Sequence, residues 1–282
     1  GRQRLGAEGE LEHHPGALRH SASWRNRVGR ASRLPRFAFG LLGLLLLAAC
    51  GSGTTDKMVV RVATDATWPP FEFVDEASKE ISGFDIELMN AVAEKAGFEV
   101  EWINIGFDPI ITGMAQCTYD AAISAITVTD ERKAAFAFSD PYIAAGQVVT
   151  VQAGNTDITG KDTLAGKVLG VQLGTTGEIE GKTIVAEQGA TMKTYDDVGL
   201  AFQDLINGQI DAVIADNLLA IEYIGKNPDK LKTAGAVFTD EFYAIAVCKT
   251  NTDLVKQIND GLAAVKQEGL LDQLTTKWIV GQ

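Results

Sequence analysis

Short runs of β-branched and apolar residues alternate with helix-like segments from residue 58 onward, and this alternation limits the fold more than any other feature. The runs 59–63 and 100–105 have the composition of strands. Between them, one apolar stripe recurs at every fourth position, at Phe84, Leu88, Val92 and Ala96. Gly97 follows, where a helix commonly ends. The pattern predicts an α/β protein in which mostly parallel sheets have helices on both faces.

The following segments continue this alternation. Asp108 and Pro109 suit the N-cap and first turn of a helix that runs to about Ala115. Residues 119–126 are expected to form a buried strand, and Thr129 is expected to cap the next helix.

Two stretches of the chain also resemble each other, YDAAIS at 119–124 and IDAVIA at 210–215. A helix-like segment containing Gly113 or Gly208 precedes each of them. Each pair is expected to form a helix followed by a parallel strand with polar residues at its end. The repetition favours two similar lobes, and residues 50–282 are numerous enough for two lobes of roughly 100 residues each.

The distribution of charge excludes one class of partner. Residues 1–49 contain eight Arg, no Lys and three acidic residues, whereas residues 50–282 contain 17 basic and 34 acidic residues. Binding to a phosphate backbone requires a basic surface, so nucleic acid is not expected as a partner. No cofactor or metal is expected either. All three His precede residue 21, and Gly174 and Gly177 lack the Lys of a phosphate-binding loop.

The basic N-terminal region has the features of an export signal. Five Arg between residues 25 and 36 precede the apolar run 37–49, which is short for a membrane span. The run ends as LAAC at 47–50, which resembles a bacterial lipobox and implies lipid attachment to Cys50. An ordinary signal with a chance cysteine is the alternative. We therefore expect an N-terminal extension and lipoprotein signal at 1–49, a linker at 50–57, and an extracytoplasmic, membrane-anchored protein.

Polar and aromatic residues follow the predicted strands, where ligands bind in open α/β sheets. They are Asp65, Trp68, Phe107, Ser124 to Arg132, Gln172 to Thr176, and Asp216. A free amino acid requires a guanidinium and N–H donors for its carboxylate, and a carboxylate with oxygen acceptors for its ammonium. Arg132 provides the guanidinium, the turn at 174–178 provides N–H groups, and Asp216 provides the carboxylate. The sequence thus predicts an amino-acid site.

Several motifs, in order along 58–282, resemble the polar amino acid solute-binding proteins of bacterial ABC importers. They are GFDIEL at 83–88, ITVTDER at 126–132, FSDPY at 138–142, GVQLGTT at 170–176 and DAVIAD at 211–216. The resemblance implies the periplasmic-binding-protein type II fold, whose two lobes are joined by a hinge that the chain crosses twice. It further implies a monomer that closes around a free amino acid and delivers it to an ABC transporter permease.

The resemblance also implies roles for residues at the amino-acid end of the ligand. Arg132 would clamp the ligand carboxylate, helped by Thr127 and by the backbone N–H of Thr176. The ligand ammonium would meet Asp216, the Thr127 hydroxyl and the Ala125 carbonyl. Ser124 and Thr175 complete this part of the expected set.

At the other end, Trp68 and Phe107 would sandwich the ligand side chain, with Asp65 near its polar end and Gln172 opposite. A single carboxylate among neutral neighbours favours a basic amino acid or glutamine over an acidic one. The sequence does not separate these two ligand classes.

Plainer roles exist for most of these residues. Arg132 follows two acidic residues and suits a solvated helix start, Asp216 suits a helix cap, and Trp68 suits a core. Asp85 and Glu87 are expected to be favourable charges at a helix N-terminus rather than functional groups.

Within the implied fold, the chain would cross between lobes near 142–146 and 242–246. Lobe 1 would comprise 58–141 and 247–282, and lobe 2, with the hinge segments, 142–246. A strand at 243–249 would run antiparallel to 119–126, which places Cys248 beside Cys117. We expect a disulfide between them, the alternative being two free thiols.

Two other functions fit the same scaffold. One is an enzyme similar to cyclohexadienyl dehydratase, which would need Asp65 as its general acid. The other is a receptor that presents an amino acid to a sensor. We expect binding without chemistry.

Overall fold

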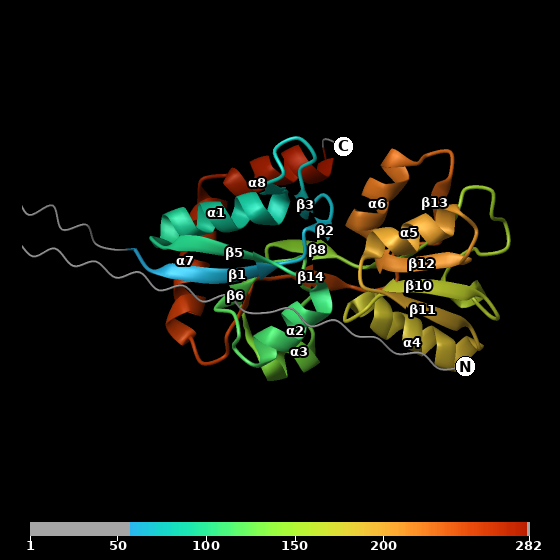
Figure 1. The fold of residues 1–282 in the computed structure, drawn as a ribbon, viewed down its shortest axis with the longest axis horizontal. Coiled ribbons are helices and arrows are strands. Elements are labelled where there is room, and N and C mark those ends of the chain that lie inside the picture. Colours follow the sequence, from blue (N-terminus) through green and yellow to red (C-terminus); the bar gives the residue numbers. More distant parts are fainter. Residues whose placement is uncertain (1–56, 281–282) are drawn as a thin grey trace, which may run out of the picture. The chain divides into compact units, whose positions relative to one another are not determined.

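Two separate five-stranded sheets organise residues 57–280, the part of the chain that the computed structural model describes (Figure 1). The predicted signal, the expected lipid site at Cys50 and nearly all of the linker lie outside the described residues. Within 57–280, none of the helices combines the length and apolar character that crossing a bilayer requires.

The first sheet has the strand order β5-β1-β6-β15-β7. Its strands are β1 (Val59–Thr64), β5 (Glu99–Asn104), β6 (Ala121–Ala122), β7 (Ala137–Phe138) and β15 (Ala246–Val247). Strand β1 pairs in parallel with β5 and β6, whereas β15 runs antiparallel to β6 and β7. The accompanying helices are α1 (Phe84–Ala96), α2 (Phe107–Ala115), α3 (Asp130–Ala135), α7 (Thr252–Gln267) and α8 (Leu270–Thr275), with a π-helical turn, η2 (Thr276–Val280).

The second sheet has the strand order β11-β10-β12-β9-β13. Its strands are β9 (Gln147–Gln152), β10 (Val168–Gln172), β11 (Thr191–Tyr195), β12 (Ala212–Asp216) and β13 (Leu231–Ala234). Helices α4 (Thr176–Gln188), α5 (Val198–Ile206) and α6 (Asn217–Lys226) pack against it, with α4 on the opposite face from α5 and α6 (Figure 1). Strand β10 is parallel to β11 and β12, and β9 is antiparallel to β12 and β13. The α/β class is confirmed, and each sheet joins a parallel trio to antiparallel strands.

The two stretches that resemble each other in sequence occupy matching positions. Strand β6, within 119–124, lies between parallel β1 and antiparallel β15. Strand β12, which begins within 210–215 and ends at Asp216, lies between parallel β10 and antiparallel β9. The repeated sequence therefore corresponds to a repeated strand environment.

Two smaller sheets complete the described part of the fold. Strands β8 (Ile143–Ala145) and β14 (Glu241–Tyr243) pair antiparallel, close to the two predicted crossings. Strands β2 (Thr67–Trp68), β3 (Glu72–Val74) and β4 (Ile81–Ser82) form a three-stranded sheet that holds Trp68. The lobe boundaries at 141/142 and 246/247 remain a prediction.

Helix α1 has the predicted bounds, and Gly97 ends it with a φ of 81° in the left-handed region. Helix α2 begins two residues earlier than expected, at Phe107, with Gly106 at the cap, so the prediction of Asp108 as N-cap is wrong. The long strand expected at 119–126 is also wrong in extent. Ala125 adopts a φ of 46°, which interrupts the extended backbone, and regular pairing is limited to Ala121–Ala122.

The expected antiparallel partner of this segment is nevertheless present. The Ala244 N–H donates to the Ile126 carbonyl, and the Cys248 N–H donates to the Asp120 carbonyl. This register places Cys248 beside Cys117, and a disulfide joins them with a Cα–Cα distance of 4.9 Å, as predicted.

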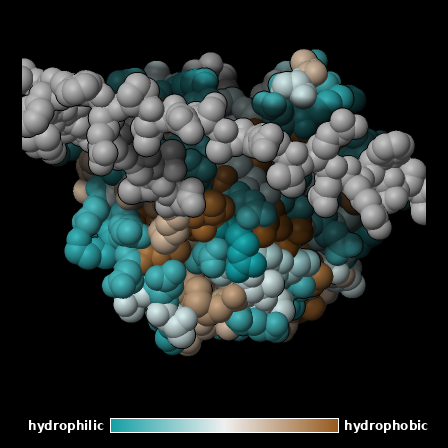
Figure 2. All heavy atoms as spheres, turned by 60° about the vertical axis from the view of Figure 1, so that its left-hand side comes forward, coloured by the Kyte–Doolittle hydropathy of each residue, from teal (hydrophilic) through white to brown (hydrophobic). Residues whose placement is uncertain are grey.

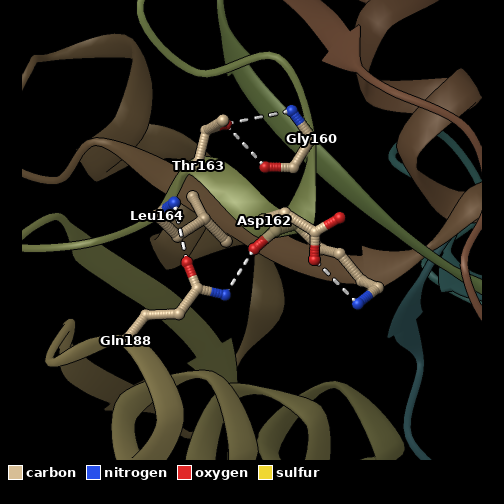
Figure 3. Close-up of polar contacts among 6 residues, drawn as sticks. Gly160, Asp162, Thr163, Leu164 and Gln188 are labelled. Carbon is tan, nitrogen blue, oxygen red and sulfur yellow. Dashed lines mark hydrogen bonds and ion pairs between the residues drawn. The ribbon is translucent and has the colours of Figure 1, made fainter.

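A network of hydrogen bonds fixes the connection between β9 and β10 (Figure 3). The Thr163 hydroxyl, in the short helix η1 (Lys161–Thr163), accepts from the Gly160 N–H and donates to the Gly160 carbonyl. The Gln188 amide accepts from the Leu164 N–H and donates to the Lys161 carbonyl. These contacts fasten the loop to the end of α4.

Apolar side chains fill the space between the sheets and their helices. The largest fully buried residues include Phe71, Phe84 and Tyr243 around the first sheet and Phe202 and Leu164 around the second. On the face shown in Figure 2, hydrophobic areas are small and lie among hydrophilic side chains. Because the buried side chains are closely packed, the core holds the residues that follow the strands in a rigid framework.

Candidate functional site

One cavity brings together nine of the eleven residues predicted to bind ligand. It is lined by Trp68, Phe107, Ser124, Ala125, Thr127, Arg132, Thr175, Thr176 and Asp216. The remaining two, Asp65 and Gln172, contact each other. The cavity volume is about 10 Å³, which suits roughly one water molecule. The predicted residues thus meet at one place, while their roles in binding remain a prediction.

The Arg132 guanidinium spans the two sides of this cavity. Arg132 is 5% exposed, and Thr129 caps its helix α3 by accepting from the Arg132 N–H, as predicted. The guanidinium donates to the Thr127 carbonyl at 2.7 Å and to the Gly174 carbonyl at 3.0 Å. It also lies 5.4 Å from the centroid of the Phe107 ring, within cation–π range. Burial lowers the pKa of Arg132 to about 10, so the guanidinium stays charged at neutral pH.

The Asp216 carboxylate lies at the end of β12, 4% exposed. It stands at the N-cap position of α6, yet its side chain makes no capping hydrogen bond. Instead it accepts from the Tyr243 hydroxyl at 2.7 Å. Burial, followed by the charge of Glu241, raises the pKa of Asp216 to about 7. The alternative that Asp216 serves as a side-chain cap of α6 is therefore wrong.

A second carboxylate, Glu241, contacts two residues that line the same cavity, and sequence reasoning missed it. It lies on β14 and is 8% exposed. Its Oε2 accepts from the hydroxyls of Thr127 at 2.8 Å and Thr176 at 3.0 Å, and its Oε1 from the hydroxyl of Thr239 at 2.7 Å. Its position, directly before the segment 242–246 expected to cross between lobes, was the available signal.

Asp65 and Gln172 form the far end of the site. The Gln172 side-chain amide donates to the Asp65 carboxylate at 2.9 Å, and the Thr67 hydroxyl donates to the same carboxylate at 2.8 Å. Burial raises the pKa of Asp65, and the charge of Asp197 raises it further. Asp65 therefore has a carboxylate neighbour, which corrects the expectation that its neighbours are all neutral.

Trp68 and Phe107 both line the cavity and are 5% and 6% exposed. Among the described residues, the Trp68 indole N–H has no hydrogen-bond partner. Trp68 belongs to the hydrophobic core and also lines the cavity, and its contact with a ligand side chain remains a prediction.

The loop after β6 is held by buried carboxyl groups. The Ala125 N–H donates to Asp85 at 2.7 Å, and the Ser124 hydroxyl donates to Glu72 at 2.9 Å. The Tyr142 hydroxyl also donates to Asp85, at 2.8 Å. Burial raises the pKa of Asp85 to about 6, and burial with the Asp85 charge raises the pKa of Glu72 well above its ordinary value. Asp85 lies in the first turn of α1, as expected, and it also supports the loop, a contact that the sequence did not indicate.

The start of α4 presents the other side of the cavity. Thr175 caps this helix by accepting from the Glu178 N–H at 3.2 Å, and its hydroxyl donates to the Gln172 carbonyl. Thr176 is the first residue of the helix, where backbone N–H groups have no partner inside the helix. Such N–H groups favour an anion.

Two larger pockets flank the cavity. One of about 440 Å³ lies beside Arg132 and Thr175, among residues of α2, α3 and α4. The other, of about 280 Å³, includes Asp108 and Asp196 near the Asp65 end. The small cavity is the better candidate site because the buried charged groups Arg132 and Asp216 face it.

Two α/β halves whose strand ends converge on buried opposite charges define a receptor for a small solute. The chain belongs to the bacterial extracellular solute-binding proteins of family 3, whose pattern it matches over residues 60–281.

Individual relatives are also similar. The L-cystine-binding protein TcyJ of Escherichia coli K12 is 33% identical over 257 residues, which cover 89% of this chain and 96% of that protein. A solved structure of an ancestral arginine-binding protein bound to arginine has a TM-score of 0.75 and 41% identity, covering 79% of this chain and 99% of that chain. The ancestral amino acid-binding protein AncCDT-1, a precursor of cyclohexadienyl dehydratase, has a TM-score of 0.72 and 33% identity, covering 78% and 95%.

Proposed function

We propose that this protein captures a free basic amino acid, with arginine as the first candidate, and delivers it to the permease of an ABC transporter. Arg132 and Asp216 support this most directly. Arg132 lies on α3, beside the first sheet, and Asp216 lies at the end of β12, in the second sheet. Both residues line the same cavity. A guanidinium and a carboxylate in this arrangement match the two charges of an amino acid.

The charges of the candidate site as a whole favour a cationic side chain. The candidate site contains one buried cation, Arg132, and three buried carboxyl groups, Asp65, Asp216 and Glu241. A buried charge without a partner costs several kcal/mol. A basic amino acid adds a net positive charge to this acidic site, whereas an acidic one adds a further negative charge. The arginine-bound structural neighbour is consistent with this preference. Glutamine remains the alternative, because Gln172 and Asp65 also suit an amide.

Binding requires the two halves to separate. The cavity of about 10 Å³ is too small for an amino acid, and Arg132 and Gln172 each reach across to the other half. We propose that lobe 1 (58–141 and 247–282) and lobe 2 with its hinge (142–246) open at β8 and β14, then close on the ligand. A closed, liganded form gives the permease a distinct surface to recognise.

The site supports binding without chemistry. A dehydratase would need a general acid free to reach its substrate. Asp65 is held by Gln172 and Thr67. No His lies after residue 20.

A thermal-shift screen of the twenty amino acids, followed by calorimetry with arginine, lysine, histidine and glutamine, tests the proposal. We expect arginine to raise the melting temperature most, because a ligand bound only to the folded protein stabilises it. A parallel assay with prephenate should show no turnover. Lack of a response to every amino acid, or turnover of prephenate, would contradict the proposal.

The N-terminal region completes the proposal. We propose that the protein acts as a monomer outside the cytoplasm, anchored through a lipid on Cys50. Expression of the full chain and its Cys50→Ser variant in a bacterial host, with a labelled fatty acid, tests the anchor. The parent should carry label and sediment with membranes, and the variant should carry none. Equal labelling of both chains would refute lipidation at Cys50.

A further inference from the structure

Glu241 makes contacts that link both sides of the candidate site. Its Oε2 accepts from the hydroxyl of Thr127, which precedes α3, and from the hydroxyl of Thr176, which begins α4. Strand β14, which holds Glu241, belongs to neither large sheet and pairs only with β8 among the described strands. One carboxylate oxygen therefore joins two cavity residues from different halves.

These contacts limit what the two hydroxyls can do. A threonine hydroxyl has one proton to donate and two lone pairs to accept with. Thr127 and Thr176 both donate that proton to Glu241. Thr176 also accepts from the Gln147 side-chain amide at 3.0 Å, so one lone pair remains. Toward the cavity, both hydroxyls can act only as acceptors.

Acceptors suit an ammonium and repel a carboxylate. The Asp216 carboxylate borders the same cavity, and the charge of Glu241 helps to raise the pKa of Asp216. The side of the cavity with Asp216, Thr127 and Thr176 thus presents oxygen lone pairs and negative charge. Donors remain at the Arg132 guanidinium and at the backbone N–H groups that begin α4.

We propose that Glu241 is a specificity-determining positioning residue. It accepts the hydrogen bonds that the Thr127 and Thr176 hydroxyls donate, so that both hydroxyls are oriented to accept from the ligand ammonium. This inference rests on the proposed amino-acid function. It removes the Thr127 hydroxyl from the set expected to help bind the ligand carboxylate, and it leaves that carboxylate to Arg132 and backbone N–H groups.

The isosteric variant Glu241→Gln tests this polarity. An amide can donate to a hydroxyl, which turns the hydroxyl proton toward the cavity and against an ammonium. We expect the dissociation constant for L-arginine, measured by calorimetry, to rise at least about tenfold. Glu241→Asp keeps an acceptor and should lose less affinity than Glu241→Gln. Asp240→Asn, an exposed neighbour with the same change of charge, is the matched control and should bind as the parent does.

A double-mutant cycle with Thr127→Val separates this role from simple support of the fold. Thr127→Val should weaken arginine binding strongly in the parent and much less in Glu241→Gln, because the acceptor is already lost there. The melting temperature of each unliganded variant shows whether the fold persists.

Additive effects of the two changes on affinity, or unaltered affinity in Glu241→Gln, would overturn this inference. If the parent protein still binds arginine in that case, the proposed function stands. A parent that binds no amino acid would instead overturn both.

Discussion

The buried carboxylate of Asp85 accepts a hydrogen bond of 2.7 Å from the backbone N–H of Ala125, forty residues away in the sequence. Ala125 has a φ of 46°, a conformation that costs an alanine roughly 1 kcal/mol or more. The contact compensates that cost and holds Ala125 where it lines the cavity. Asp85 therefore supports the part of the candidate site that Ala125 contributes.

Replacing Asp85 with alanine should destabilise the protein and weaken ligand binding. The change leaves the Ala125 N–H and the Tyr142 hydroxyl without their shared acceptor, and each buried unpaired group costs about 1–3 kcal/mol. Urea unfolding should show a loss of about 2–5 kcal/mol. Glu87→Ala, in the same helix, removes only a half-exposed contact to Lys277 and should change stability by less than about 1 kcal/mol. Equal losses in both variants would refute this role.

Removing the Arg132 guanidinium should abolish tight binding. Arg132→Ala is expected to raise the dissociation constant for arginine at least about 100-fold, because the ligand carboxylate would then be buried without its charged partner. Lys133→Ala, at the exposed neighbouring position of α3, provides the control and should bind as the parent does. Full affinity in Arg132→Ala would invalidate the proposed site, especially if Asp216→Ala also retained it.

The unliganded protein should lose stability as pH rises, in part through Asp216. The pKa of this carboxyl is raised from 3.8 to about 7, so the folded state holds its proton where the unfolded state has released it. Stability from this group is full below about pH 4 and declines as pH rises to about 7. Asp216→Asn removes the dependence, since the amide does not ionise.

Melting curves of the parent and Asp216→Asn at pH 4 to 8 measure this effect. The advantage of the variant should grow with pH and reach on the order of 2–4 kcal/mol above pH 7, while arginine binding is lost. A constant difference across this range would contradict the raised pKa.

Asp65 should determine preference for a cationic ligand. Asp65→Asn is expected to weaken arginine binding at least about tenfold, because the far end of the site loses its negative charge. Binding of glutamine, which has no side-chain charge, should change much less. The exposed Asp240→Asn serves as the charge-matched control. An equal loss of affinity for both ligands would show that Asp65 acts on something other than side-chain charge.

The Cys117–Cys248 disulfide should add to stability without contacting the ligand. It closes a loop with a sequence separation of 131 residues, and removal of such a link typically costs about 2–5 kcal/mol. A double Cys117→Ser, Cys248→Ser variant should unfold at lower urea and still bind arginine. A thiol assay on the unfolded, unreduced parent should find neither cysteine reactive, and two reactive thiols would contradict the bridge.

Local patterns were sufficient for helix α1 and for the positions of Arg132 and Asp216. The spacing of four residues gave α1 and its end at Gly97. The cap at Thr129 placed Arg132 at a helix start, and the strand at 212–215 placed Asp216 at its end. Each feature depends on neighbours a few positions away, which the sequence displays directly.

Local patterns were insufficient where distant segments meet. The break at Ala125 depends on Asp85, and the orientation of the Thr127 hydroxyl depends on Glu241, 114 residues further along. No periodicity marks such pairs, and Asp85 in the first turn of a helix looks like an ordinary dipole partner.

The sequence alone thus determined the class of fold and the residue types at the ends of the strands, and the fold implied by the resemblance indicated the cysteine pair. Only the tertiary structure decided which buried carboxyl groups support the site and which way its hydroxyls donate. The physical reason is that propensity and periodicity act over a few residues, whereas burial and hydrogen-bond polarity depend on groups that packing brings together.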